Sequence, residues 1–266
     1  MNRIEARFSE LKEQKKKGLV VYIGAGDPHL EATERLALSF DEAGVDILEL
    51  GIPFSDPLAD GIVNQLAAQR GLASGTTPVG VLNTVRSIRE KSQIPIVFFV
   101  YYNLIHQYGL ERFVTDAAAS GVDGLLVLDL PPEEGELYHE AMTKGGLLPI
   151  YLIAPTTPED RVELIASQAS GFIYYVSREG VTGMQSEIAD SIGPMTAKIR
   201  EHTDLPIAIG FGISNPEQAT KVASFGDACV VGSAVVKRIG EQGDSDSLVD
   251  TVGGFVRELN EALKAI

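Results

Sequence analysis

The chain is poor in the residues that build several common kinds of site. Its one cysteine, Cys229, excludes an intrachain disulfide and a thiolate metal cage. No apolar run approaches the roughly 18 residues of a membrane-spanning helix. The N-terminal segment, residues 1–17, is charged and polar, unlike a secretory signal. These absences predict a protein of a reducing, cytoplasmic compartment.

Basic residues are also scarce. The chain has 22 Lys and Arg against 37 Asp and Glu, for a net charge of −15. Nucleic acids and anionic membrane surfaces bind clustered positive charge, so we expect neither as a partner. The one basic run, Lys15–Lys17, is short, and we interpret it as the C-terminal cap of a first helix.

Length and hydrophobic pattern together predict the fold. The chain has 266 residues, 44% of them hydrophobic, and a single α/β barrel typically needs about 250 residues. Short, continuously apolar runs alternate with amphipathic segments, which is typical of a parallel sheet covered by helices. The predicted strands are Leu19–Ile23, Ile47–Leu50, Ile96–Tyr101, Gly124–Leu128, Pro149–Ile153, Phe172–Val176, Ile207–Ile209 and Ala228–Val231. Eight such units predict an α/β protein, a single (β/α)₈ TIM barrel over residues 1–266 with an additional N-terminal helix.

Local signals mark the ends of several predicted helices. Thr157 and Asn215 each precede a proline, which predicts a capping residue followed by proline at the first helical position. Gly44 and Gly121 follow amphipathic segments and precede strands, so we expect helices to end there. The amphipathic segments include Leu30–Ala43, Leu110–Ser120, Pro158–Ser167 and Pro216–Ser224.

Glycine-rich turns follow the last three predicted strands, at Gly180–Gly183, Gly210–Ser214 and Gly232–Ser233. Barrel enzymes place their sites at the C-terminal ends of the strands, and phosphate groups commonly bind the last loops. Glycine lets the backbone approach a ligand, and N–H groups at a helix start bind phosphate oxygens. The glycines could instead serve only tight turns. Together they favour a phosphorylated small molecule as ligand.

Two carboxylates follow the second predicted strand. Glu49 lies inside the apolar run Ile47–Leu50, where an ionisable group is costly unless it is paired or functional. Alternation along a strand directs Glu49 into the barrel, where desolvation favours its protonated form and suits general acid–base catalysis. Asp60 lies on a loop broken by Pro53 and Pro57. The structural alternatives are an ion pair for Glu49 and a helix N-cap for Asp60.

Other residue types narrow the chemistry. Aldol cleavage through a Schiff base needs a lysine on a strand, and all ten lysines fall in predicted helices or loops. Metal-dependent aldol cleavage would favour clustered histidines as ligands, but the four histidines are scattered through helical or loop segments. Two reactions remain: acid–base cleavage without a covalent intermediate, and isomerisation of a sugar phosphate.

The segment Leu48–Gly61 closely resembles the signature of tryptophan synthase alpha chains. The resemblance covers nearly the whole chain. It includes Gly26–Pro28, Tyr101, Asn103, Asp129–Pro131, Ser177–Gly183, Gly210–Ser214 and Gly232–Ala234.

This resemblance implies a retro-aldol lyase of tryptophan biosynthesis that cleaves indole-3-glycerol phosphate into indole and glyceraldehyde 3-phosphate. Glu49 matches the family's general acid–base, and Asp60 matches the residue that interacts with the indole N–H. Thr182 falls on a mobile loop that closes over the site. The positions similar to phosphate-binding residues are Gly183, Phe211, Gly212, Gly232 and Ser233. The positions similar to residues lining the indole pocket are Tyr22, Tyr101, Tyr174 and Phe211.

The resemblance also implies a partner. Family members work with a beta chain that holds pyridoxal phosphate, so we expect an alpha2-beta2 tetramer and neither cofactor nor metal in this chain. The loops after strands two, three and six would contact the beta chain. This sequence departs from the family near the barrel mouth or those loops. It has Ile62–Val63–Asn64 where family members often have Pro-Thr-Ile or Pro-Val-Ile. It also has Gly24 where a threonine is common nearby, and Tyr102 where the usual residue is smaller.

Three alternatives stay open at this point. The chain could be a stand-alone indole-3-glycerol phosphate lyase that releases indole. It could be another phosphate-binding barrel, such as a sugar-phosphate isomerase of histidine or tryptophan biosynthesis. It could also regulate a partner without turnover, although retention of Glu49 and Asp60 argues against that.

Overall fold

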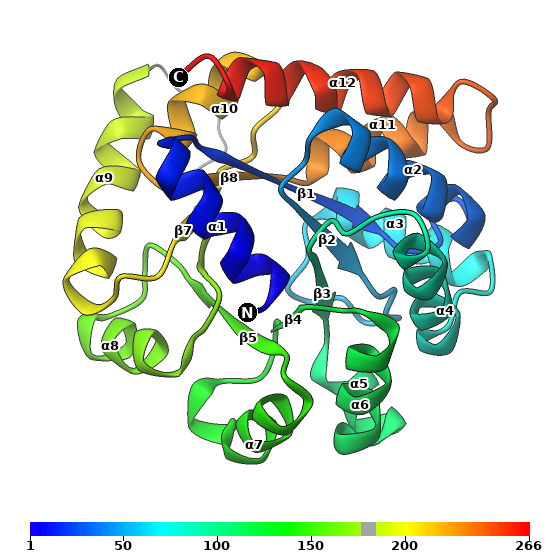
Figure 1. Ribbon diagram of the computed structural model, residues 1–266, viewed down its shortest axis with the longest axis horizontal. Coiled ribbons are helices and arrows are strands. Elements are labelled where there is room, and N and C mark those ends of the chain that lie inside the picture. Colours follow the sequence, from blue (N-terminus) through cyan, green and yellow to red (C-terminus); the bar gives the residue numbers. More distant parts are fainter. Residues whose placement is uncertain (177–184) are drawn as a thin grey trace.

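The computed structural model describes residues 1–176 and 185–266, and its strands close into a barrel (Figure 1). The eight strands are parallel and pair in sequence order, and β8 pairs with β1. They are β1 Gly18–Gly24, β2 Ile47–Gly51, β3 Ile96–Val100, β4 Gly124–Val127, β5 Leu148–Ile153, β6 Ile173–Val176, β7 Ile207–Gly210 and β8 Ala228–Val231. Each predicted strand end lies within one residue of the observed end, so the predicted barrel is confirmed.

Helices surround the barrel (Figure 1). They are α1 Arg3–Gln14, α2 Leu30–Ala43, α3 Ile62–Ala73, α4 Pro78–Arg89, α5 Tyr102–Tyr108, α6 Leu110–Ser120, α7 Glu136–Gly145, α8 Glu159–Gln168, α9 Gln185–His202, α10 Pro216–Ala223, α11 Ser233–Gln242 and α12 Leu248–Leu263, with a 3-10 turn η1 at Pro132–Glu134. The predicted additional helix before the first strand is confirmed as α1. Within the described ranges, no helix is long and apolar enough to cross a membrane.

Most predicted helix ends are confirmed. Gly44 and Gly121 end α2 and α6 in the left-handed conformation, and Lys15 caps α1. The Asn215 side chain accepts a hydrogen bond from the backbone N–H of Gln218, which caps α10. The predicted cap at Thr157 is wrong: α8 begins one residue later than expected, and the Thr157 hydroxyl accepts instead from the backbone N–H of Ala154 at 3.0 Å.

Alternate strand residues divide the core into two layers. The outward side chains pack under the helices, as Leu48 and Leu50 of β2 do. The inward side chains form a second cluster inside the barrel, together with Ile4, Phe8 and Leu11 of α1. Because α1 fills the N-terminal end of the barrel with apolar side chains, the interior is left for a ligand only at the opposite end.

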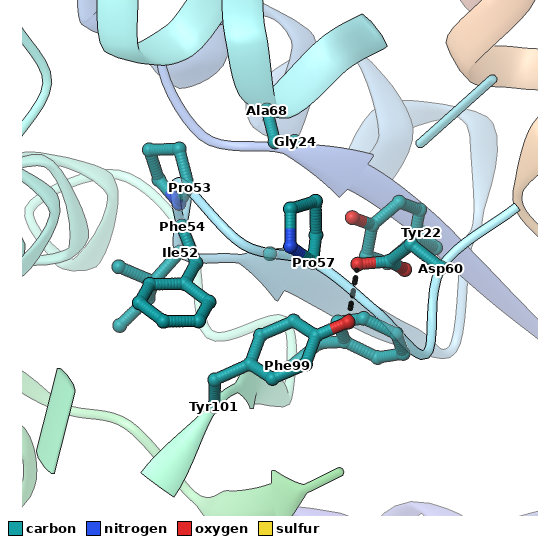
Figure 2. Close-up of a pocket in the computed structure, with 11 residues that line it drawn as sticks. Tyr22, Gly24, Ile52, Pro53, Phe54, Pro57, Asp60, Ala68, Phe99 and Tyr101 are labelled. Carbon is teal, nitrogen blue, oxygen red and sulfur yellow. Dashed lines mark hydrogen bonds between the residues drawn. The ribbon is translucent and has the colours of Figure 1, made fainter. Parts of the chain in front are cut away.

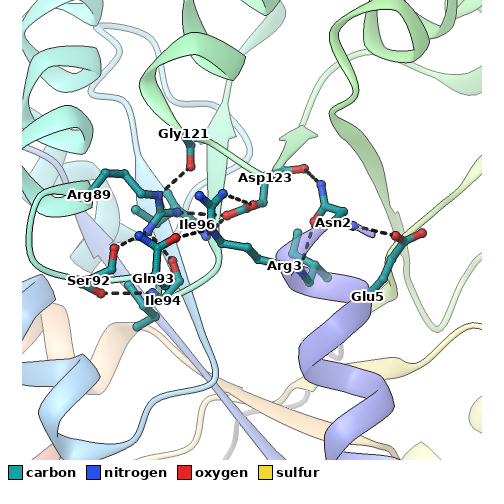
Figure 3. Close-up of polar contacts among 11 residues, drawn as sticks. Asn2, Arg3, Glu5, Arg89, Ser92, Gln93, Ile94, Ile96, Gly121 and Asp123 are labelled. Atoms are coloured by element: carbon teal, nitrogen blue, oxygen red, sulfur yellow. Dashed lines mark hydrogen bonds and ion pairs between the residues drawn. The ribbon is translucent and has the colours of Figure 1, made fainter.

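Asp123 fastens α1 and α4 to the N-terminal end of the barrel (Figure 3). It directly precedes β4, and its carboxylate accepts from Arg3 at 2.9 Å and from Arg89 at 3.0 Å. It also accepts from the backbone N–H of Ile96, at the start of β3, at 2.8 Å. Burial lowers the pKa of Arg89 to about 10, against the opposing effect of Asp123. Two strands and two helices therefore meet at one buried carboxylate.

The same arrangement recurs before β2 and β8. Asp46 accepts from the backbone N–H of Leu19, the second residue of β1, at 2.6 Å, and pairs with Arg7 of α1. Asp227 accepts from the backbone N–H of Ile207, the first residue of β7, at 2.8 Å and pairs with Arg200. Acidic residues at this end of the barrel thus hold neighbouring strands in register and attach helices to them.

Candidate active site

A cavity of about 900 Å³ opens at the C-terminal ends of the strands. The fold brings most of the described residues of the predicted site to this cavity, although Glu49 does not line it. Seven of the predicted site residues line it: Tyr22, Asp60, Tyr174, Phe211, Gly212, Gly232 and Ser233. Tyr101 lines a smaller neighbouring pocket, which also includes Tyr22 and Asp60 (Figure 2). Thr182 and Gly183 lie outside the described residues.

Glu49 occupies the middle of β2 and points into the barrel, as predicted. It lies in register with Tyr22 of β1 and Val97 of β3, and its side chain is fully buried. Neither carboxyl oxygen has a hydrogen-bond partner among the described residues. Burial without a partner raises the pKa of Glu49 to about 8. The carboxyl group therefore carries a proton at neutral pH, and no described residue forms the alternative ion pair with it.

Asp60 is held at the edge of the cavity by Tyr101. The Tyr101 hydroxyl donates to Asp60 Oδ2 at 2.9 Å (Figure 2). It also accepts from the backbone N–H of Ala59 at 3.0 Å. The Gln65 side-chain amide donates to the backbone carbonyl of Asp60 at 2.9 Å. Burial raises the pKa of Asp60, and hydrogen bonds from Tyr101 and Asn64 partly offset that rise. The alternative role as helix cap is wrong, because Gly61 is the N-cap of α3.

Aromatic rings form the walls between these carboxyl groups. The rings of Tyr22 and Phe99 meet edge to face, with centroids 4.8 Å apart. Tyr174 of β6 is buried, and this burial raises the pKa of its phenol. Glycines make room for the rings: a Cβ at Gly51 would lie 2.4 Å from the Tyr22 hydroxyl, and one at Gly210 3.1 Å from the Tyr174 hydroxyl.

The far side of the cavity is formed by the turns after β7 and β8. Gly212 has φ +61°, which favours glycine, and Gly232 precedes α11. Ser233 is the first residue of α11, and no described side chain caps this helix. The first N–H groups of a helix have no partners within it, so the start of α11 offers several donors to an anion.

A family model described as tryptophan synthase alpha chain matches residues 8–264. The tryptophan synthase alpha chain of Geotalea uraniireducens (strain Rf4) is 48% identical over 266 residues, covering 100% of this chain and 99% of that protein. The chain belongs to the tryptophan synthase alpha chain family. Membership of this family does not favour the alternatives of a sugar-phosphate isomerase or of a regulatory barrel that has lost catalytic turnover.

Further relatives agree with the family assignment. The tryptophan synthase alpha chain of Geobacter sulfurreducens is 49% identical over 263 residues, covering 99% of each chain. Among solved structures, tryptophan synthase subunit alpha from Legionella pneumophila str. Paris superposes with a TM-score of 0.92 at 38% identity, covering 100% of both chains. The barrel and its cavity are therefore those of a family member along the full length of the chain.

Several cavity residues escaped the sequence reasoning. Phe99, Leu128 and Leu152 line the cavity from β3, the end of β4 and β5. The signal for Phe99 was available, because it lies two residues before Tyr101 and two after the inward Val97. Asn64 also lines the cavity, although its sequence position marked it only as a departure from the family pattern.

One group of side chains in the described ranges could hold a metal ion. Glu159 of α8 lies with Glu201 and His202 of α9, and their ligand atoms are within 4.8 Å of one another. None of the three lines the cavity, and Lys198 approaches Glu159 to 3.5 Å. This group is therefore separate from the candidate active site.

Proposed function

We propose that this family member is a carbon–carbon lyase that cleaves indole-3-glycerol phosphate into indole and glyceraldehyde 3-phosphate. The observation that carries the proposal is the fully buried carboxyl group of Glu49, which has no partner among the described residues and lies in register with Tyr22 of the cavity wall. A carboxyl group with a pKa of about 8 exchanges a proton readily near neutral pH, as general acid–base catalysis requires.

The two ends of the cavity fit the two ends of this substrate. The indole ring would pack between Tyr22, Tyr101 and Tyr174, with its N–H directed to the Asp60 carboxylate. The phosphate would lie at the turn of Phe211 and Gly212 and at the start of α11, residues 232–233, where backbone donors point at an anion. Thr182 and Gly183, outside the described residues, would complete the site.

The cleavage needs a proton at the ring carbon and loss of a proton from a hydroxyl group. Glu49 begins protonated and delivers its proton to the ring carbon that bears the glycerol chain. The ring nitrogen then carries positive charge, and the Asp60 carboxylate stabilises it. Glu49, now ionised, takes the proton of the adjacent glycerol hydroxyl. As the C–C bond breaks, its electron pair restores the indole ring, the C–O bond becomes the aldehyde, and Glu49 is again protonated.

Asp60 and Glu49 take different parts because their surroundings differ. Asp60 accepts hydrogen bonds that favour its charged form, whereas Glu49 has none that do so. Two carboxyl groups with separated pKa values can act as charge stabiliser and proton carrier in one site.

We further propose that the chain acts with a beta chain that holds pyridoxal phosphate, in an alpha2-beta2 tetramer, and binds no cofactor or metal itself. Leu58 and Ile62, after β2, are 91% and 67% exposed, and such apolar side chains fit a protein interface. The cytoplasm suits its one cysteine, Cys229, which is buried as a thiol with its pKa raised to about 12. Residues 1–266 would form a single domain, since β1 and β8 close one barrel.

The deciding experiment is an assay of indole release from indole-3-glycerol phosphate, with and without a beta chain. We expect indole in both arms and faster release with the partner. Equal, fast release in both arms would instead indicate a stand-alone lyase. Absence of indole in both would contradict the proposed reaction.

A further inference from the structure

One residue of the cavity wall, Asn64, carries a buried polar atom without a hydrogen-bond partner among the described residues. Among the described residues, five side-chain N or O atoms are shielded from solvent and lack a hydrogen bond. Three of the five belong to Glu49 and Asn64, on either side of Asp60 in sequence. Native proteins seldom leave such atoms unsatisfied without a reason. The acid–base proposal explains Glu49 but leaves Asn64 Oδ1 without a role.

Asn64 lies four residues after Asp60, is the third residue of α3, and lines the cavity. Its side chain lowers the pKa of the Asp60 carboxyl group, which places the amide close to that group. A carboxylate only accepts, so the amide Nδ2 is the end that suits Asp60, and Oδ1 is left without a partner among the described residues. The orientation of the amide is thus set by Asp60, and the leftover atom is an acceptor.

The course of α3 places Asn64 between the two ends of the cavity. One turn further along the helix, Ala67 packs against Val236 of α11 and Tyr22 of β1. Helix α11 begins at Ser233, where the phosphate is proposed to bind. Asn64 therefore belongs to the wall that runs from Asp60 to the phosphate turns.

We propose that Asn64 bridges Asp60 and the substrate, with Nδ2 holding the Asp60 carboxylate and Oδ1 accepting a hydrogen bond from a hydroxyl of the glycerol chain. This inference rests on the proposed function. An acceptor needs a donor, and the phosphate dianion offers none. The ring N–H is already matched by Asp60. The glycerol hydroxyls are the remaining donors, and they lie between ring and phosphate as Asn64 does between Asp60 and α11.

The bridge gives Asn64 two separable effects. As an acceptor it makes the cavity prefer a hydroxylated chain over an unsubstituted one. As a donor it positions Asp60 and holds the pKa of that carboxyl group down. Loss of the donor therefore raises the pKa of Asp60 and moves the acidic limb of the activity profile to higher pH.

The test compares two ligands in two variants. One ligand is indole-3-glycerol phosphate, and the other is 3-(indol-3-yl)propyl phosphate, which keeps the ring, chain length and phosphate but has no hydroxyls. Affinities are measured by calorimetry in a Glu49→Gln background to prevent turnover. Asn64→Leu, close in size, removes donor and acceptor. We expect the preference for the hydroxylated ligand to fall about tenfold, the effect of one hydrogen bond, with binding of the propyl ligand within about twofold.

Asn64→Asp separates the two effects and guards against misfolding of the leucine variant. It keeps an acceptor and loses the donor. Its added charge acts on both phosphate ligands alike, so their affinity ratio should stay near that of Asn64. In an otherwise unsubstituted chain, both variants should shift the acidic limb of kcat/KM to higher pH. Asn83→Leu, the same change on the exposed face of α4, should alter neither readout.

The outcomes are distinct. An unchanged ligand preference in Asn64→Leu, or an equal loss for both ligands, would overturn the bridge while leaving the lyase proposal intact. An unshifted acidic limb in both variants would overturn the positioning of Asp60. Failure of the chain with Asn64 intact to bind either ligand would overturn the proposed function, and the bridge with it.

Discussion

Replacement of Glu49 with Gln is expected to make the protein more stable and far less active. Glu49 is fully buried, has no hydrogen-bond partner in the part of the chain that the structure describes, and has a pKa of about 8 rather than 4.5. Glutamine has nearly the same size and, like the protonated carboxyl group, carries no charge. The substitution therefore removes the proton carrier and also the cost of keeping an ionisable group dry.

The sign of the stability effect follows from the two pKa values. The unfolded chain releases the Glu49 proton near pH 4.5 and the folded chain near pH 8. Between these values the unfolded state binds fewer protons, so stability falls as pH rises. This loss of folding stability is absent below pH 4.5 and complete above pH 8. At about 1.4 kcal/mol per pKa unit, it reaches about 3 kcal/mol at pH 7 and about 5 kcal/mol above pH 8.

The measurement is urea unfolding of the unsubstituted and Glu49→Gln proteins from pH 5 to pH 9, with turnover assayed alongside. The free-energy difference in favour of Glu49→Gln should grow with pH and level off above pH 8. Turnover should fall by about 10²–10⁴-fold, the usual contribution of a general acid–base. In the unsubstituted protein, kcat/KM should decline above about pH 8, as Glu49 loses its starting proton. A pH-independent difference in stability, or near-normal turnover in the variant, would refute the reasoning.

Three further outcomes are expected. Asp60→Asn should lower kcat about 10²–10³-fold, because a neutral amide cannot balance charge on the ring nitrogen. Substrate affinity, measured by calorimetry, should change much less. An equal fall in affinity would instead make Asp60 a binding residue. Sulfate soaked into crystals should bind at Gly212, Gly232 and Ser233, and an ion bound only elsewhere would contradict the phosphate site. Asp123→Asn should lower the free energy of unfolding by about 3 kcal/mol, seen in the urea midpoint, because Arg89 loses its buried partner; an unchanged midpoint would contradict that assignment.

The barrel could be predicted closely because its signals are local. Each strand is a short apolar run flanked by turn residues, and glycine at positions 44 and 121 marks two helix ends by its left-handed backbone. The error at Thr157 has a local cause. The Thr157 hydroxyl accepts a hydrogen bond from the backbone N–H of Ala154 within the turn, and Pro158 rather than Thr157 is the N-cap of α8. A sequence pattern cannot choose between two such local partners.

The site could be predicted in part. Glu49 was evident, because one ionisable residue in an apolar strand has few structural explanations. The bond between Tyr101 and Asp60 joins residues 41 positions apart and depends on the path of the loop after β2, which no spacing encodes. The role of Asn64 was hidden for a related reason. A polar residue at the start of a helix is usually solvated, and only the closure of the barrel brings it against the cavity.

Buried carboxyl groups at the two ends of this barrel have opposite energetic effects. At the N-terminal end, Asp123 accepts hydrogen bonds from Arg3, Arg89 and the backbone of Ile96, so its charge is fully matched within the protein. Further toward the C-terminal end, in the middle of β2, the Glu49 carboxyl group has no hydrogen-bond donor among the described residues. A matched charge stabilises the fold but is inert toward a ligand. An unmatched group costs stability and is left free to exchange a proton with whatever enters the cavity. The same residue chemistry thus supports structure at one end and reactivity at the other, and the difference lies in the donors that the neighbouring strands and helices supply.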